Sequence, residues 1–143
     1  MPKPIIIASD HGGFELKQKI KQWLVQSNIA FDDVGTDSDA DVDYPVFVKR
    51  AVKQILYHNT AGIIICGSGI GVSIAANRYR GIRAALATTE VTTQLCRQHN
   101  DANVLCLGGR ILDHALAIRL VQIFLETPFL GGKYQRRNEL LEM

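Results

Sequence analysis

Three short segments combine side chains that can move protons with glycines that leave backbone N–H groups open to a ligand. They are Ser9-Asp10-His11-Gly12-Gly13, Cys66-Gly67-Ser68-Gly69-Ile70-Gly71 and Arg97-Gln98-His99-Asn100-Asp101. Imidazole titrates near neutral pH, and a thiolate is both a base and a nucleophile. Brought to one crevice, a carboxylate, a thiol and two imidazoles could therefore carry out proton transfer on a small substrate.

The glycine-rich segment 67–71 is the most informative of the three. An apolar run, then glycines, then a helix beginning near Val72 presents several N–H groups to an anion. The dinucleotide fingerprint would need a third glycine where Val72 stands, and a phosphate-binding P-loop would need a Gly-Lys-Ser/Thr triplet. We expect an anion site of neither type; a tight turn that only allows close helix packing is the alternative.

Each candidate side chain also has an ordinary structural interpretation. Cys66 could be a base or nucleophile, or an inert buried thiol like Cys96 and Cys106. His99 could be a general acid, or a solvated histidine at a helix end. Asp10 with its neighbour could equally cap a helix.

Cations that could hold a phosphate lie near the end of the chain. Lys133 and Arg137 are four residues apart and share one helix face, and Arg110 follows the last apolar run. A solvated helix face is the alternative. Aspartates at 37, 39, 41 and 43 resemble the start of a calcium loop, but valines at 42 and 48 replace its glycine and glutamate, so we predict a solvated loop and no metal.

The elements that would position these residues alternate along the chain. Apolar runs typical of buried strands lie at 5–8, 30–34, 62–66, 82–87 and 104–107, and helical spacing of apolar residues lies at 16–24, 48–56 and 116–124. Asp43 before Tyr44-Pro45 predicts a helix start, and a short final helix is expected to end near 143. Such alternation predicts a three-layer α/β/α sandwich, Rossmann-like, with a five-stranded parallel sheet and ligands at the carboxyl ends of the strands.

Composition sets the class of protein. The 143 residues, 47% hydrophobic and 21% charged, fit one globular domain over 1–143, and a net charge of +2 favours neither nucleic acid nor membrane as a partner. The chain lacks an apolar run long enough for a signal peptide or a membrane span. Three cysteines without metal or disulfide spacing predict a cytoplasmic protein.

Taken together and in order, six motifs resemble one family. They are Ser-Asp-His-Gly-Gly at 9–13, Asp-Tyr-Pro at 43–45, Cys-Gly-Ser-Gly-Ile-Gly at 66–71, Ala-Ala-Asn at 75–77, Gly-Ile-Arg-Ala at 81–84 and Arg-Gln-His-Asn-Asp at 97–101, followed by Gly-Gly-Lys-Tyr-Gln-Arg-Arg. This combination resembles the type B ribose-5-phosphate isomerases, a family that also contains galactose-6-phosphate isomerase subunits.

The resemblance implies an aldose–ketose isomerase without a cofactor. Cys66 would be the base that moves the proton between C1 and C2. His99 would be the acid that opens the sugar ring, with Asp10 assisting at the ring hydroxyl. Some members carry a glutamate as base just after the last glycine of the loop; here that position is Val72, which leaves Cys66 as the candidate.

The same resemblance assigns the binding residues and the assembly. Gly67, Ser68, Gly69, Ile70 and Gly71 would stabilise the enediolate, and the other substrate contacts would be His11, Asn100, Arg110, Lys133 and Arg137. Lys133 stands where relatives often have arginine, so its phosphate contact lacks the bidentate fork. A homodimer or dimer of dimers is implied, with the active site between subunits and His99, Asn100 and Arg110 supplied by the partner chain.

Two other functions stay open from the sequence. The substrate could be a six-carbon sugar phosphate, allose 6-phosphate or galactose 6-phosphate. The chain could also be a nonenzymatic sugar-phosphate sensor on the same fold, although the presence of both Cys66 and His99 argues against it. Nucleic-acid binding through the C-terminal basic run lacks an aromatic platform.

Overall fold

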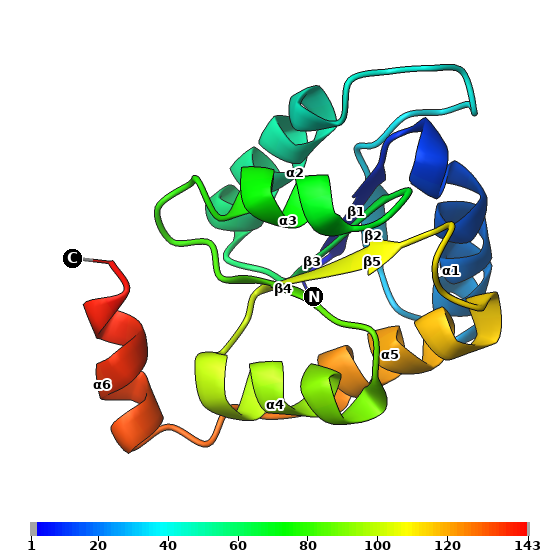
Figure 1. The fold of residues 1–143 in the computed structure, drawn as a ribbon. Helices are drawn as coiled ribbons and strands as arrows, with labels where there is room; N and C mark the ends of the chain where they lie inside the picture. The colour runs from blue at the N-terminus through cyan, green and yellow to red at the C-terminus, as the bar shows by residue number, and fades with distance from the viewer. Residues whose placement is uncertain (1–2, 143) are drawn as a thin grey trace.

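The computed structural model describes residues 3–142 as alternating strands and helices (Figure 1). The strands are β1 (Ile5–Ser9), β2 (Phe31–Asp33), β3 (Gly62–Cys66), β4 (Ala84–Leu86) and β5 (Val104–Gly108). The helices are α1 (Phe14–Gln26), α2 (Tyr44–His58), α3 (Ile70–Ala76), α4 (Glu90–Asn100), α5 (His114–Glu126) and α6 (Lys133–Leu140), with a single 3-10 turn, η1 (His11–Gly13), before α1.

All five strands are parallel, in the order β2-β1-β3-β5-β4. From β1 the chain moves outward to β2 and then returns to the other side of β1 with β3. The direction of winding therefore reverses between β1 and β3, and in open parallel sheets the ligand crevice lies beyond the carboxyl ends of the strands at such a reversal. Asp10 and Gly67 directly follow these two strands.

Alternation of side chains along the strands explains the three layers. Ile6 and Ala8 of β1 belong to the core that the sheet forms with α2 and α3, whereas Ile5 and Ile7 point to the core under α1 and α5. Strands buried on both faces read as continuous apolar runs, as Gly62–Cys66 does. The predicted three-layer sandwich with a five-stranded parallel sheet is confirmed.

One helix differs from the prediction. Residues 97–101 lie outside the helical spacing recognised in the sequence, yet they form the last turn and cap of α4. This helix begins after Thr89, whose side chain accepts a hydrogen bond from the Thr92 N–H. Only Thr93 and Cys96 of this helix are buried, so its sequence contains few of the buried apolar residues by which α1, α2 and α5 were recognised. The two edge strands are also shorter than expected.

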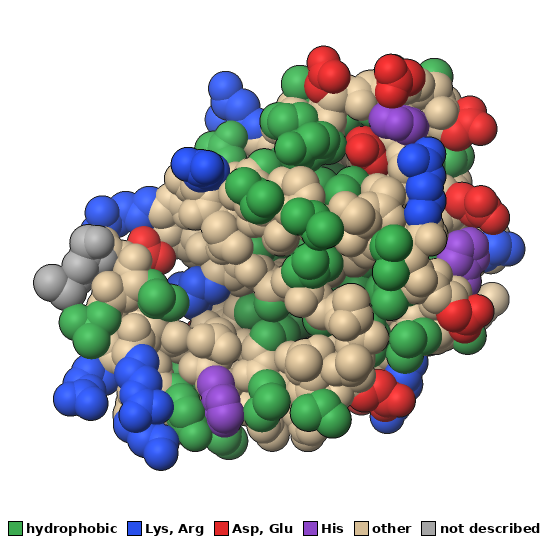
Figure 2. All heavy atoms as spheres, viewed as in Figure 1, with side chains coloured by type: hydrophobic (Ala, Val, Ile, Leu, Met, Phe, Trp, Pro, Cys, Tyr) green, Lys and Arg blue, Asp and Glu red, His purple; other side chains and the backbone are tan. Residues whose placement is uncertain are grey.

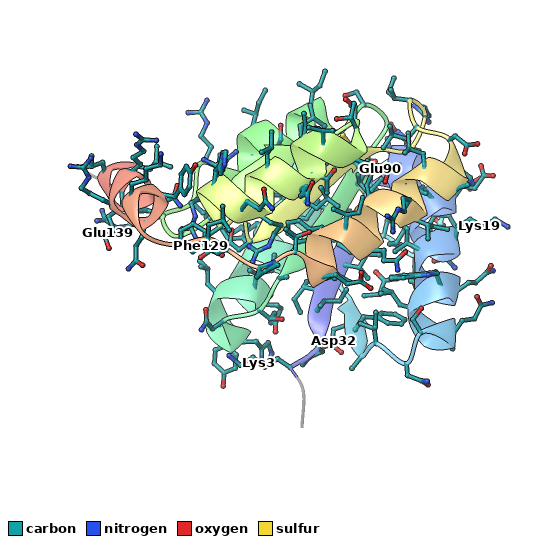
Figure 3. The ribbon with its side chains drawn as sticks, turned by 90° about the horizontal axis from the view of Figure 1, so that it is seen from below. Lys3, Lys19, Asp32, Glu90, Phe129 and Glu139 are labelled. Carbon is teal, nitrogen blue, oxygen red and sulfur yellow. The ribbon has the colours of Figure 1, made fainter. Side chains whose placement is uncertain are left out.

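The last helix stands apart from the three layers. Figures 1 and 3 both show α6, which carries Glu139, at the margin of the molecule beside the end of α4. Two hydrogen bonds fix it there: Asn138, buried, donates to the His99 carbonyl at 3.1 Å, and the Leu130 N–H donates to the Gln98 carbonyl at 3.1 Å. The final helix is therefore anchored on the segment that contains His99.

Candidate active site

The loops that follow β1, β3 and β5 pack directly on one another at the carboxyl edge of the sheet. The Gly109 N–H donates to the Cys66 carbonyl at 2.8 Å, and the Arg110 N–H donates to the Gly67 carbonyl at 2.9 Å. A Cβ added at Gly12 would lie 2.9 Å from the Gly67 nitrogen. A larger side chain at Gly12 would therefore have no room, and the three loops form one closely packed surface, called here the floor of the site.

Cys66 ends β3 at the centre of this floor. It is 5% exposed, and the Gly69 N–H donates a hydrogen bond to its Sγ at 3.1 Å. Gly69 can do so because its φ of +79° turns the chain back over the strand end, where a Cβ would lie 2.8 Å from the Leu107 carbonyl carbon. A donor thus sits where negative charge would develop if the thiol gave up its proton.

The other two thiols have different surroundings. Burial raises the pKa of Cys96 to about 11, and the neighbouring Arg97 only partly offsets this. Burial also raises the pKa of the Cys106 thiol, and its neighbour Cys66 adds to the effect. Both thiols therefore stay protonated at neutral pH and serve as core residues.

The segment after Cys66 forms a tight turn into α3. Ser68 is exposed, and its Oγ accepts a hydrogen bond from the Ile70 N–H at 3.2 Å. A Cβ added at Gly71 would lie 2.8 Å from Cζ of Tyr44, so the Tyr44 ring borders this turn. The turn therefore leads directly from the thiol at the end of β3 to the start of α3.

Asp10 and His11 lie beside this turn. Asp10 is 7% exposed and its Oδ1 accepts from the Gly13 N–H at 3.2 Å, so it does cap the short turn η1, as the alternative interpretation held. His11 Nδ1 accepts from the Val42 N–H at 3.2 Å, and its Nε2 lies 3.2 Å from Asp41 Oδ1. In the neutral imidazole the proton is therefore on Nε2.

The aspartate-rich segment 37–43 is an exposed loop, as predicted, and its Asp41 and Val42 also contact the imidazole of His11. Thirty-one residues separate Val42 from His11 in the chain, so spacing gave no sign of this contact. Among residues 3–142, no group of three or more His, Cys, Asp or Glu side chains is placed to hold a metal ion.

A second group of predicted site residues gathers where α4 meets α6. The imidazole of His99 stacks on the Tyr134 ring, with centroids 4.2 Å apart and planes 11° from parallel. Lys133 Nζ and Arg137 Cζ lie 5.3 Å and 5.9 Å from the centroid of the same ring. Asn100 ends α4, and its carbonyl accepts from Arg83 Nε at 2.8 Å.

The two groups lie at opposite ends of the parallel strands. The helix α4 connects two parallel strands and so runs antiparallel to them, which puts its end, with His99, near the start of β5. Cys66 pairs with Gly108 at the other end of β5, four residues after Val104, a separation on the order of 13 Å along the strand. Within one chain, therefore, His99 does not reach Cys66.

Arg110 belongs to the first group. A Cβ added at Gly67 would lie 3.5 Å from Arg110 Nη1, so this side chain covers the glycine-rich turn of its own chain. The expectation that Arg110 comes from a partner together with His99 and Asn100 is wrong in this respect. It follows β5, whereas His99 precedes that strand, and the strand separates the two.

A family model described as Ribose/Galactose Isomerase matches residues 5–141. The chain belongs to this isomerase family. The predicted resemblance is thereby confirmed, while the roles of single residues remain predictions.

Members of the ribose/galactose isomerase family with known names or structures are similar over nearly their whole length. Ribose-5-phosphate isomerase B of Escherichia coli is 39% identical over 140 residues, 97% of this chain and 94% of the relative. A ribose 5-phosphate isomerase from Thermotoga maritima has a TM-score of 0.96 at 48% identity, with 99% of each chain covered. Ribose-5-phosphate isomerase B from Mycoplasma genitalium, solved with bound ribulose-5-phosphate, has a TM-score of 0.93 at 40% identity, covering 97% of this chain and 93% of that one.

Sequence reasoning missed two aromatic side chains at these groups. Tyr134 lies within the Gly-Gly-Lys-Tyr-Gln-Arg-Arg motif but was not expected to touch His99. Tyr44 was expected only near a helix start, and its ring lies against Gly71 at the end of the glycine-rich turn. Both belong to quoted motifs, yet only the fold could show which residues they contact.

Proposed function

We propose that this isomerase interconverts ribose 5-phosphate and ribulose 5-phosphate through an enediolate, a reaction of the pentose phosphate pathway. The observation that carries the proposal is the thiol of Cys66 at the end of β3, with the Gly69 N–H on its sulfur and the glycine-rich turn around it. The membership of the family and the ribulose-5-phosphate bound to the Mycoplasma genitalium relative favour this pair of sugars.

Proton transfer between C2 and C1 is the role proposed for Cys66. As a thiolate it removes the C2 proton of the open-chain aldose, and the electron pair moves toward O1 to give the enediolate. Backbone N–H groups of segment 67–71, with Ser68, stabilise the charge on that oxygen, a role in which one donor contributes roughly 3 to 4 kcal/mol. Transfer of the hydroxyl proton from O2 to O1 and return of the carbon-bound proton from Cys66 to C1 then give the ketose and regenerate the thiolate.

Ring opening must precede this step when the substrate is the cyclic aldose. We assign His99 as the acid that protonates the ring oxygen, while Asp10 accepts the proton of the anomeric hydroxyl. The phosphate is then held by His11 and Arg110 on one side and by Lys133 and Arg137 on the other, with Asn100 also in contact with the sugar. Fixing the distal phosphate orients C1 and C2 at the thiol.

This assignment requires two copies of the chain, because within one copy His99 and Cys66 lie at opposite ends of the parallel strands. We propose a homodimer, or a dimer of dimers, in which α4 and α6 of one subunit approach the glycine-rich turn of the other. An unpartnered apolar face supports it: Ile70 and Ile74 of α3 and Val91 of α4 are 53%, 54% and 65% exposed. Figure 2 shows hydrophobic side chains across this face and Lys and Arg gathered over α6.

The organisation and location of the chain complete the proposal. One continuous sheet contains strands from Ile5 to Gly108, which supports a single domain over 1–143. All three cysteines are free thiols, which supports a cytoplasmic location. Among the described residues, no helix is both long and apolar enough to cross a membrane.

A substrate panel tests the function. Purified wild type, Cys66→Ala and the control Cys96→Ala are assayed for aldose–ketose conversion of ribose 5-phosphate, allose 6-phosphate and galactose 6-phosphate. We expect ribose 5-phosphate to be preferred, and only Cys66→Ala to lose turnover. If a six-carbon sugar phosphate were preferred, it would be the substrate in place of ribose 5-phosphate. If none of the sugar phosphates were converted, the proposed isomerase activity would be rejected in favour of a nonenzymatic sensor.

A further inference from the structure

The imidazole of His99 is oriented by an aromatic ring. Its ring is nearly parallel to that of Tyr134, at 11° and 4.2 Å between centroids. The hydrogen bond from Asn138 reaches the His99 backbone carbonyl, and among residues 3–142 none of the hydrogen bonds reaches either imidazole nitrogen. The plane of the imidazole is therefore set by Tyr134, and within residues 3–142 neither of its nitrogens is engaged in a hydrogen bond.

The same tyrosine organises the two cations of α6. Lys133 Nζ lies 5.3 Å and Arg137 Cζ 5.9 Å from the Tyr134 centroid, within the range in which a cation is attracted to the electron-rich face of an aromatic ring. Lys133 precedes Tyr134 and Arg137 follows it by three residues, so all three project from adjoining positions on α6. One ring thus contacts the proposed acid and both proposed phosphate ligands of this half of the site.

We propose that Tyr134 is a positioning residue that fixes His99 for ring opening and spaces Lys133 and Arg137 for the phosphate. The inference rests on the proposed function, since it assigns no new reaction. The aromatic ring, and not the phenol hydroxyl, supplies the effect, because stacking and attraction of cations are both properties of the ring face.

Two substrates separate ring opening from the later proton transfer. Ribose 5-phosphate is mainly cyclic, so its conversion needs the acid. Ribulose 5-phosphate cannot close a five-membered ring, because the phosphate occupies its C5 oxygen, and its conversion begins directly at C1 and C2. A residue that positions His99 should therefore matter more for the first sugar than for the second.

Three variants test this: Tyr134→Leu removes the ring, Tyr134→Phe keeps it, and Gln135→Ala changes an exposed neighbour on the same helix. In Tyr134→Leu we expect the saturated initial rate from ribose 5-phosphate to fall about tenfold and that from ribulose 5-phosphate by less than about threefold. The other two variants should stay within about twofold on both sugars.

The contact itself is checked without activity by NMR. Ring protons of His99, identified by their loss in His99→Asn, should be shifted by the ring current in wild type and Tyr134→Phe and return toward ordinary values in Tyr134→Leu. The inference is overturned if this shift is absent, if Tyr134→Leu converts ribose 5-phosphate as fast as wild type, if both sugars lose rate equally, or if Tyr134→Phe is as impaired as Tyr134→Leu. A wild type that shows the shift yet turns over neither sugar would reject the proposed function and leave the contact standing.

Discussion

Three thiols in one small chain differ in what surrounds them. All three are buried, but Cys66 ends β3 with an N–H donor on its sulfur, whereas burial raises the pKa of Cys96 and of Cys106. Reactivity of a thiol follows its thiolate fraction and its access to solvent. The position of Cys66 at the end of a strand could be predicted from the sequence, but the donor on its sulfur depends on the turn at Gly69.

Alkylation should distinguish the thiols. With a pKa of about 11, Cys96 is a thiolate in on the order of one molecule in a thousand at pH 8, so iodoacetamide should spare it. We expect mass spectrometry to find Cys66 modified first, in step with loss of turnover, and ribose 5-phosphate to slow the reaction. Faster modification of Cys96 than of Cys66 would contradict the environments described.

Removing the carboxylate of Asp41 should strengthen substrate binding. In the structure it occupies the Nε2 side of His11, where a phosphate oxygen is proposed to bind, and it adds negative charge there. Asp41→Ala should lower KM about twofold with kcat unchanged, and the gain should shrink at high salt because Asp41 is exposed. Asp39→Ala is the control; a higher KM in Asp41→Ala would mean that Asp41 helps His11 to bind.

At the scale of the elements, a buried lysine anchors the segment after β2. Lys17 of α1 is fully buried, and its Nζ donates to Asp33 at 2.9 Å and to the Thr36 carbonyl. Burial lowers the pKa of Lys17, against the opposing effect of Asp33. Burial acts to raise the pKa of Asp33, but hydrogen bonds from Lys21, Lys17 and the backbone outweigh it and lower that pKa.

This ion pair should make stability depend on pH at the acid end. Because the pKa of Asp33 is lower in the folded chain than in the unfolded one, its contribution is present above about pH 4 and is lost as pH falls through the folded value. Asp33→Asn should lose this part of the acid dependence in urea unfolding between pH 3 and pH 7. It should also be less stable at pH 7 by roughly 3 kcal/mol, since the Lys17 charge is left buried. If the free energy of unfolding of Asp33→Asn fell between pH 7 and pH 3 as steeply as that of the wild type, this role of Asp33 would be contradicted.

The sequence predicted the elements unevenly for physical reasons. Strands buried on both faces and helices with an apolar stripe, such as α2, are visible as patterns in the chain. α4 is a mostly polar helix, capped by Thr89 and packed against α5 and α6, so it offers few apolar residues from which a pattern could be recognised. Lys17 shows the same limit, since nothing in helical spacing tells which polar residue of a helix becomes buried.

At the scale of the whole molecule, the residues of the proposed site are divided between the two ends of the parallel strands. Cys66 and Arg110 lie at the carboxyl ends, and His99 with Tyr134 lies near the amino ends. The sequence could indicate which residues take part, but the length of β5 separates them within one chain. Whether two subunits join them depends on contacts between chains, which no pattern within one chain specifies.

Mixing two inactive variants tests the shared site. If each site takes Cys66 from one subunit and His99 from the other, a mixed dimer of Cys66→Ala and His99→Asn contains one site with both wild-type residues. Random pairing makes half of the dimers mixed, with half of their sites intact, so refolding an equal mixture should restore about a quarter of wild-type activity. No recovery, with mixed dimers verified by native mass spectrometry, would place the complete site within one chain.

The distance along β5 between the two groups also bears on how the enzyme behaves at low concentration. A subunit alone would keep its sheet, its helices and its circular dichroism, yet have no complete site. Under the proposed arrangement, specific activity falls on dilution below the dissociation constant of the dimer, and turnover becomes second order in chain concentration. Each chain would then fold by itself and become an enzyme only upon meeting another.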